Sequence, residues 1–371
     1  MMYFFFMYIS GINLDNFRNY NTLSLEIPTQ GALFVGANGT GKTNLLEAVF
    51  LLCTARSQRG SSRSDLIRFG SDYCHVQGTF TGSHAKAATT VSIGLGRDQK
   101  VSMRINDKPL ASFSQWLGHS IAVSFSPHDL KLVQGIPKER RNFLDLVISQ
   151  IDPAYLDSLI CYKKSCLQRN NLLMRRIFDA QLDAFEDEMV KYGSYIFAKR
   201  QEILDCMHPI FEEFYQEISG KNEVGSFVYK PSISCDSSTQ NDWENVFFTG
   251  IKKARNKDIQ NGYSSVGPHR DDILLFVNGQ DARAFASLGQ CTTTSLALKM
   301  SSVLVSQKYK GEEMVFLFDD AANYLDSMRT ARIFPLLSQR GQILITAPLE
   351  REPHNLDMPK FCIQEGSVHS L

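Results

Sequence analysis

The chain carries the octapeptide Gly36-Ala37-Asn38-Gly39-Thr40-Gly41-Lys42-Thr43 directly after the apolar run Ala32-Leu33-Phe34-Val35. It matches the phosphate-binding loop pattern G-x-x-x-x-G-K-[ST] in full, in the strand-to-helix context that the pattern needs. The glycines let backbone N–H groups close around phosphate oxygens, and the helix that begins near Lys42 points its positive end at the anion. We expect Lys42 to meet the β- and γ-phosphates and Thr43 to hold Mg²⁺. A glycine-rich turn with only a structural role would not need Lys42 and Thr43, so the sequence predicts a nucleoside triphosphate site.

Composition bounds the remaining possibilities. The 371 residues are 43% hydrophobic, which is enough for a full core and long enough to favour two lobes. Lys+Arg and Asp+Glu both number 39, so a polyanion such as DNA would have to be held by a local basic patch. The eight cysteines form no C-x-x-C pair, which argues against a zinc site or a disulfide framework and favours reduced thiols in the cytosol.

The apolar start of the chain, residues 1–9, does not resemble a targeting segment. It lacks a basic region, a cleavage site and the length to span a bilayer. Its second half is expected to be the first strand, and either Met1 or Met7 can be the biological start. No other stretch is long and apolar enough for a membrane, so we expect a cytoplasmic protein.

The first part of the chain has mostly strand character. Residues 7–35 are predicted to be β, with alternating polarity in 23–27, and residues 44–52 to be a helix packed under a sheet. Further short strands are predicted and are expected to form an antiparallel patch attached to the phosphate-binding core: 74–80, 89–95, 101–105 and 121–125.

The middle of the chain changes to helical periodicity. Residues 138–217 have few glycines and apolar residues at three and four spacing, which predicts a separate helical lobe. The polar stretch 220–261, with a strand signal at 225–229, is interpreted as the return path. A strand at 273–277 closes with Asn278-Gly279, a strong hairpin turn signal. The predicted domains are 1–130, 131–257 and 258–371, the first and last being two parts of one core.

A second half of the nucleotide site follows the apolar run 314–318, which ends in Asp319-Asp320. A carboxylate at the end of a buried strand beside the loop can reach the Mg²⁺ shell, and the next residue points elsewhere. Asp319 is the predicted Mg²⁺ partner and Asp320 the candidate to orient the attacking water. The alternative is a strand that ends in a solvated acidic turn.

Another phosphate-binding surface is predicted at Ser287-Leu288-Gly289-Gln290, which opens an apolar helix. A hydroxyl, a bare backbone N–H and a helix N-terminus with about half a positive charge meet there. Two such surfaces in one chain suit a head that sandwiches ATP between two copies of itself. An ordinary helix N-cap is the alternative interpretation.

At several independent places the residues resemble the RecF family, ATPases of the ABC class related to SMC heads, and the resemblance covers almost the whole chain. The stretches that carry it are Asn16-Phe17-Arg18-Asn19-Tyr20, residues 41–48, Gly135-x-Pro137-x-x-Arg140-Arg141-x-Phe143-Leu144-Asp145, residues 168–173 and Gly267-Pro268-His269-Arg270-Asp271-Asp272. The chain departs from the family pattern at His128, Leu288, Cys291-Thr292 and Asn323-Tyr324. These departures bear on hydrolysis rate and dimer contacts more than on ATP binding.

The resemblance implies an α/β fold, an ABC-type ATPase head with an antiparallel β patch and a helical insertion lobe. It also implies nucleotide-binding roles for Ser287, Gly289, Gln290 and Asp326. The expected activity is ATP-driven dimerisation, binding of duplex DNA near gaps, and cooperation with RecO- and RecR-like partners to load a RecA-like recombinase, with slow hydrolysis as the reset.

Arginines cluster just after the helix of the phosphate-binding loop. Arg56, Arg59, Arg63 and Arg68 stand among small hydroxyl residues, a composition that suits contacts to DNA backbone phosphates. A solvated basic loop is the alternative. Three rival functions are also considered: an ATP-binding subunit of a membrane transporter, a small-molecule kinase, and an architectural DNA binder whose site is a relic. The large insertion between Lys42 and Ser287 argues against a transporter subunit. The element at residues 287–290 argues against a kinase, which would not need it. The complete set of phosphate- and metal-binding groups argues against a relic.

Overall fold

The structure is a computed structural model. It describes residues 7–82, 88–117, 121–177, 180–220, 223–235, 239–310, 314–320, 327–351 and 358–371. The predictions for Asp326, for Asn323-Tyr324 and for the start of the chain lie outside the described residues and stay predictions.

The chain divides into two compact units. The first comprises Met1–Asp129 and Ser306–Leu371, and the second comprises Leu130–Val305. The boundary after Asp129 is close to the predicted boundary at 130. Residues 258–305 pack within the second unit, whereas the rest of the predicted domain 258–371 belongs to the first. The assignment of all of 258–371 to the ATPase head stays a prediction.

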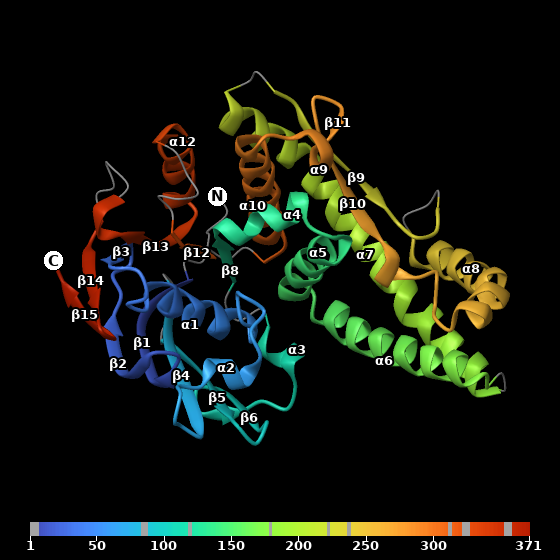
Figure 1. Cartoon of the computed structure of the whole chain (residues 1–371), viewed down its shortest axis with the longest axis horizontal. Helices are drawn as coiled ribbons and strands as arrows, with labels where there is room; N and C mark the ends of the chain where they lie inside the picture. Colours follow the sequence, from blue (N-terminus) through green and yellow to red (C-terminus); the bar gives the residue numbers. More distant parts are fainter. Residues whose placement is uncertain are drawn as a thin grey trace. The chain divides into compact units, whose positions relative to one another are not determined.

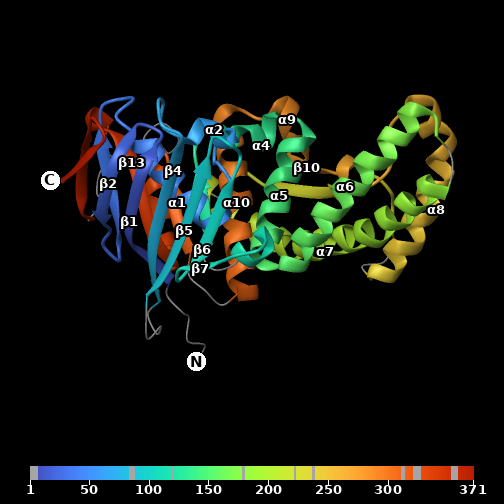
Figure 2. The same cartoon turned by 90° about the horizontal axis from the view of Figure 1, so that it is seen from below.

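A six-stranded antiparallel sheet forms one layer of the first unit. Its strand order is β2-β1-β4-β5-β6-β7, and Figure 2 shows β2, β1, β4, β5 and β6 following one another in this order. The alternating burial of β2 matches the alternating polarity predicted for residues 23–27. The strands are β1 (Met7–Phe17), β2 (Tyr20–Glu26), β4 (Tyr73–Gly82), β5 (Thr89–Gly96), β6 (Val101–Ile105) and β7 (Lys108–Pro109).

A second, mainly parallel sheet has the order β15-β14-β3-β13-β12-β8. Only the β14–β15 pair within it is antiparallel. Every residue of β3 is buried, as a continuous apolar strand covered on both faces requires. The strands are β3 (Gly31–Gly36), β8 (Ala122–Phe125), β12 (Met314–Phe318), β13 (Gly341–Pro348), β14 (Lys360–Gln364) and β15 (Ser367–Ser370).

The strand predicted at 121–125 belongs to this parallel sheet and not to the antiparallel patch. β8 pairs with β12 in parallel register, Val315 opposite Ala122 and Phe318 opposite Phe125. The patch prediction was wrong for this strand because residues 122–125 lie nearly 200 positions before their pairing partner, a distance over which local polarity carries no information.

Helix α1 (Lys42–Thr54) contacts strands of both sheets, β4 and β5 of the antiparallel sheet and β13 and β8 of the parallel one (Figure 1). Apolar residues therefore cover almost its whole circumference. Side-chain bonds also join the two sheets, because buried Gln342 of β13 donates to and accepts from the backbone of Ile9 in β1. The remaining helices of the unit are α2 (Arg63–Leu66), α3 (Phe113–Trp116), η1 (Pro127–Asp129), α12 (Ser327–Ser338) and η3 (Leu349–Arg351).

The second unit is mainly helical, as predicted for 138–217. Helix α7 packs along α6 and α8, and a three-stranded sheet of order β11-β10-β9 accompanies them. The hairpin predicted at Asn278-Gly279 is present, with φ of 50° and 77° at the two turn residues. The elements are α4 (Leu130–Gln134), α5 (Pro137–Ile151), α6 (Pro153–Arg175), α7 (Ala180–Ser219), β9 (Gly225–Lys230), α8 (Gln240–Asn261), η2 (Pro268–Arg270), β10 (Asp272–Val277), β11 (Gln280–Asp281), α9 (Ala282–Phe285) and α10 (Leu288–Lys310), which continues into the first unit.

Residues 240–261, predicted as part of a polar return path, form helix α8. Thr239 caps its N-terminus by accepting from Asp242 N, and Gly262 ends it at φ 74°. Only four of its side chains are buried, Trp243, Phe247, Ile251 and Asp258, so the apolar stripe is narrow and the sequence looked polar overall.

Candidate functional site

The phosphate-binding loop follows β3 and leads into α1, as the octapeptide predicts. Gly41 is the N-cap residue of α1 with φ 114°, a conformation that L residues with a side chain rarely adopt. A Cβ at this position would stand 2.6 Å from Asn19 Nδ2 and 2.9 Å from the Tyr20 hydroxyl. Backbone conformation and close packing therefore both require glycine here.

Two side chains from the turn between β1 and β2 hold the loop from behind. Asn19 Nδ2 donates to the Thr40 carbonyl at 2.9 Å, and the Tyr20 hydroxyl donates to the Gly41 carbonyl at 3.0 Å. Within the loop, Thr40 Oγ1 donates to the Ala37 carbonyl at 2.9 Å. Side-chain hydrogen bonds therefore hold the loop in one conformation before a ligand binds, which lowers the entropic cost of binding.

The Lys42 ammonium lies inside the loop. Its Nζ donates to the Gly36 and Ala37 carbonyl oxygens, each at 2.8 Å. Burial lowers the pKa of Lys42, while the negative charges of Asp320 and Asp319 act in the opposite direction. Because an ammonium group has three N–H donors, Lys42 can bind a phosphate oxygen at the N-terminus of α1 and keep a loop carbonyl.

A threonine and an aspartate from distant parts of the chain meet beside the loop. Thr43 Oγ1 donates to Asp319 Oδ1 at 2.8 Å, although 276 positions separate the two residues. Thr346 of β13 also donates to Asp319 Oδ1, at 2.9 Å. Burial raises the pKa of Asp319, hydrogen bonds from Thr43 and Thr346 lower it, and the charge of Asp320 raises it further.

This pair fits a magnesium ion. Mg²⁺ in nucleotide sites takes one or two protein oxygens and completes its shell with phosphate oxygens and water. The Thr43 hydroxyl and the Asp319 carboxylate supply such oxygens, and a divalent cation would neutralise a buried carboxylate whose ionised form is disfavoured. Among the described residues no group of three or more His, Cys, Asp or Glu side chains could hold a metal, so phosphate and water would have to complete the shell.

Asp320 adopts a left-handed backbone conformation with φ 56°. This region is uncommon for a residue with a side chain and marks functional sites when the surroundings enforce it. Here the Asp320 N–H donates to Thr346 Oγ1 at 2.9 Å. The turn therefore directs the two acids differently, and the role of Asp320 in orienting water stays a prediction.

The second predicted phosphate surface lies in the other unit, where Ser287 and Gln290 form a capping box at the start of α10. Ser287 N donates to Gln290 Oε1 at 2.9 Å, and Gln290 N donates to Ser287 Oγ at 3.3 Å. Gln290 Nε2 also donates to Glu223 Oε1 at 2.8 Å. The N-cap interpretation is thus correct in geometry, and because Ser287 is exposed, the N-terminus of α10 is accessible to an external phosphate.

An ion pair between Arg18 and the buried Glu47 supports the segment that carries Arg56, Arg59 and Arg63. Arg18 donates to both carboxylate oxygens of Glu47, at 2.9 and 3.0 Å, and to Ser61 Oγ at 2.7 Å. Glu47 also accepts from Ser57 Oγ. Ser57 is therefore bonded to α1 through Glu47, and Ser61 to Arg18, so the residues on both sides of Arg59 have a defined position in the first unit.

Within this segment Arg59 faces the nucleotide site. Its Nη2 donates to Asn44 Oδ1 at 3.1 Å, and its charge lowers the pKa of Asp319. Arg63 instead lies over the Phe113 ring, 5.4 Å from its centroid. Arg56, Arg59 and Arg63 are all exposed. A DNA contact stays a prediction for all three, and Arg59 is also placed to act on a nucleotide.

Sequence reasoning did not assign roles to Thr346, Asn19, Tyr20 and Asn44. Asn19 and Tyr20 appear in the sequence only within the stretch that carries the family resemblance. No local pattern marks such supporting residues, since their partners lie in other strands and loops.

Comparison with known proteins supports the same picture. The family model described as RecF/RecN/SMC N terminal domain matches residues 8–359. A curated relative from Clostridioides difficile, named DNA replication and repair protein RecF, is 34% identical over 98% of this chain and 99% of its own length. A second from Agathobacter rectalis with the same name is 34% identical over 93% of both chains.

Solved structures agree in fold. The structure of the recombination mediator protein RecF with ATP in the RecFOR pathway is 31% identical, covers 100% of this chain and 99% of its own, and has a TM-score of 0.91. An Smc head domain from Pyrococcus furiosus, 18% identical over 98% of this chain and 96% of its own with a TM-score of 0.57, shares the fold alone. By sequence and fold, this chain belongs to the RecF family of DNA replication and repair proteins.

Proposed function

We propose that this chain is an ATP-dependent DNA-binding switch of recombinational gap repair and replication restart. The observation that carries the proposal is the 2.8 Å bond between Thr43 and Asp319 beside the buried Lys42 ammonium. These groups supply the cation, the metal ligands and the helix N-terminus that a triphosphate with Mg²⁺ needs. The ATP-bound RecF structure at 31% identity supports ATP as the nucleotide.

The switch is an ATP-induced homodimer. Ser287, Gly289 and Gln290 of a second copy contact the phosphates held by the loop of the first, and Asp326 contributes to the same contact. ATP that touches both copies binds the dimer better than the monomer, and only this difference in affinity shifts the equilibrium. The exposed N-terminus of α10, with Ser287 accessible, supports this arrangement.

The dimer binds duplex DNA near single-strand gaps and helps RecO- and RecR-like partners load a RecA-like recombinase. The basic segment with Arg56, Arg59 and Arg63 contributes phosphate contacts. The RecFOR pathway named for the solved relative supports these partners. Family membership argues against the ATP-binding subunit of a transporter. No described helix is long and apolar enough to cross a bilayer.

Hydrolysis is slow and resets the dimer. Asp320 orients the attacking water and Lys42 binds the phosphates, while Thr43 and Asp319 would hold the Mg²⁺ that neutralises their charge. The hydrogen bond from Asp320 N–H to Thr346 Oγ1 fixes the backbone that carries this carboxylate.

The proposal is tested by fluorescence anisotropy on a labelled gapped duplex and a labelled continuous duplex, with ATP, ADP or no nucleotide. We expect binding only with ATP and Mg²⁺, and loss of binding in Lys42→Met. Asp320→Asn should bind ATP and DNA and release DNA more slowly. DNA binding that is independent of nucleotide, and unchanged in Lys42→Met, would contradict the switch.

A further inference from the structure

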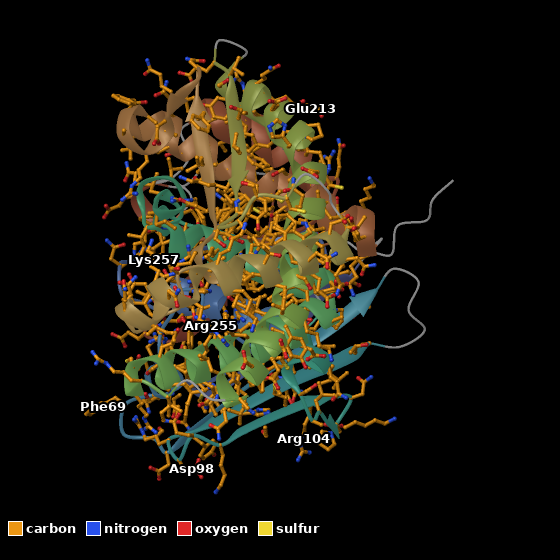
Figure 3. The ribbon with its side chains drawn as sticks, turned by 90° about the vertical axis from the view of Figure 1, so that its right-hand side faces the viewer. Phe69, Asp98, Arg104, Glu213, Arg255 and Lys257 are labelled. Atoms are coloured by element: carbon orange, nitrogen blue, oxygen red, sulfur yellow. The ribbon has the colours of Figure 1, made fainter. Side chains whose placement is uncertain are left out.

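Phe69 is the most exposed large apolar side chain among the described residues, with 98% of its surface open to water. Figure 3 labels it, with its ring standing clear of the ribbon. Tyr73, four positions later, is 59% exposed.

The ring stands on a tight turn. Ser71 N donates to the Arg68 carbonyl at 3.1 Å, which closes a four-residue turn over 68–71. Gly70, the third residue of this turn, has φ 84°, as a type II turn requires. Phe69 therefore occupies the outer corner, where its side chain projects away from the protein.

Two neighbouring segments hold the turn from either side. Asn16 O accepts from Arg68 N at 2.8 Å, and Asn16 Oδ1 accepts from Ser71 Oγ at 3.1 Å. On the other side, Arg97 Nε donates to the Ser71 carbonyl at 2.6 Å and Arg97 Nη2 to the Arg68 carbonyl at 3.3 Å. The Phe69 ring is thus presented by a rigid support and not by a loose loop.

The support is also positively charged. The Arg97 guanidinium donates to the Arg68 carbonyl, which belongs to the peptide group that joins Arg68 to Phe69, so it lies beside the Phe69 backbone. Arg68 Nη1 donates to Asn21 Oδ1 at 3.3 Å. In the described part of the chain the recorded partners of both guanidinium groups are carbonyl or amide oxygens, while the nearby Asp98 carboxylate pairs with Lys100 at 2.7 Å.

We propose that the Phe69 ring stacks on an unpaired base at the edge of a single-strand gap, while Arg68 and Arg97 attract the flanking phosphates. An exposed aromatic ring with basic side chains nearby is the arrangement by which proteins bind single-stranded nucleic acid without reading its sequence, because every base has a π-face. A protein partner would instead have to supply an apolar pocket for the ring, and it is an outcome of the test. The inference rests on the proposed DNA-binding function and deepens it, since it names the feature that distinguishes a gap from a continuous duplex.

The test compares ATP-dependent binding to a continuous duplex and to a gapped duplex of equal length, by anisotropy. Phe69→Ala should weaken binding to the gapped duplex about tenfold and leave binding to the continuous duplex unchanged. Phe69→Trp should retain the preference, whereas Phe69→Leu should behave like the alanine variant because leucine is apolar but cannot stack. Phe248→Ala, which truncates a half-exposed phenylalanine of α8, is the matched control and should change neither affinity.

A fluorescent adenine analogue placed at the first unpaired position gives a direct readout of stacking. Its emission should be quenched by the parent and by Phe69→Trp but not by Phe69→Ala. If Phe69→Ala binds both duplexes as the parent does, or loses both equally, the stacking proposal is wrong, and a protein partner becomes the remaining explanation for the exposed ring. If the parent binds neither duplex, the proposed function itself fails and the stacking proposal fails with it.

Discussion

Replacing Asp319 with asparagine would remove a charge from the metal site with almost no change in shape. The amide oxygen can still accept from Thr43 and Thr346, as the carboxylate does at 2.8 and 2.9 Å. Burial raises the pKa of Asp319 above 3.8, so its ionised form is less favourable in the folded protein than in the unfolded one. Ionised Asp319 therefore destabilises the ligand-free protein above that range, and Asp319→Asn should melt at the same or a higher temperature.

With Mg-ATP the effect should reverse. Loss of a group that supports a bound metal weakens affinity by up to about 100-fold. At an ATP concentration about a hundredfold above the parent Kd, binding adds about 2.7 kcal/mol to the parent, whereas the variant would gain only about 0.4 kcal/mol. For a domain of about 150–250 residues, each kcal/mol shifts the Tm by about 2–4 °C. The ligand-induced shift should fall from about 5–11 °C to about 1–2 °C.

Thermal melts of both proteins, with ATP and either Mg²⁺ or a chelator, provide the assay. The parent in chelator should resemble Asp319→Asn in Mg²⁺, since both lack the same metal contact. Asp98→Asn makes the same charge change at an exposed turn and should keep the full shift. A full Mg-ATP shift in Asp319→Asn would refute the assignment of this carboxylate to the metal.

Four further outcomes are expected. Ser287→Arg should leave ATP binding to the monomer intact and abolish the dimer in sedimentation, because in the proposed sandwich the exposed position faces the second copy; a dimer that persists would contradict the sandwich. Arg200→Met should destabilise the protein by about 3–5 kcal/mol in denaturant unfolding, because buried Arg200 pairs with the buried carboxylates of Asp145 and Asp271, at 2.8 and 2.7 Å; a loss below about 1 kcal/mol would contradict this contribution. Burial lowers the pKa of His269 to about 4 in the folded protein. As the pH falls, the unfolded chain takes up a proton on this residue first, so the free energy of unfolding should decrease by about 3 kcal/mol between about pH 6.5 and about pH 4. His269→Gln should flatten that part of the curve, and an identical slope would contradict the assignment. Arg59→Ala with Arg63→Ala should flatten the log-log salt slope of DNA binding by roughly two units if each arginine meets one phosphate, whereas an unchanged slope would remove the segment from the DNA surface.

The first half of the nucleotide site could be predicted from the sequence because it is local. A strand, a glycine-rich loop and a helix follow one another within residues 31–54, and each carries its own signal. Asp319 could be placed beside the loop only by combining an apolar strand with the motif far upstream. The contact with Thr43 confirms that placement in geometry.

Other parts depend on partners that no local pattern names. β8 reads like its antiparallel neighbours in sequence, but it pairs with β12. Thr346 contacts Asp319 because β12 and β13 are adjacent parallel strands. Phe318 pairs with Ile345, so the residues that follow them, Asp319 and Thr346, also lie side by side. The exposure of Phe69 depends on the turn and on its bonds to Asn16, which the sequence does not show.

The most direct test of the switch is sedimentation of the purified protein with a labelled gapped duplex. The parent, Lys42→Met and Ser287→Arg are each run with and without Mg-ATP. We predict a DNA-bound dimer for the parent with Mg-ATP only, a monomer for Lys42→Met because it cannot hold the triphosphate, and an ATP-bound monomer for Ser287→Arg. A parent that binds ATP yet stays a monomer indifferent to DNA would contradict the proposed switch.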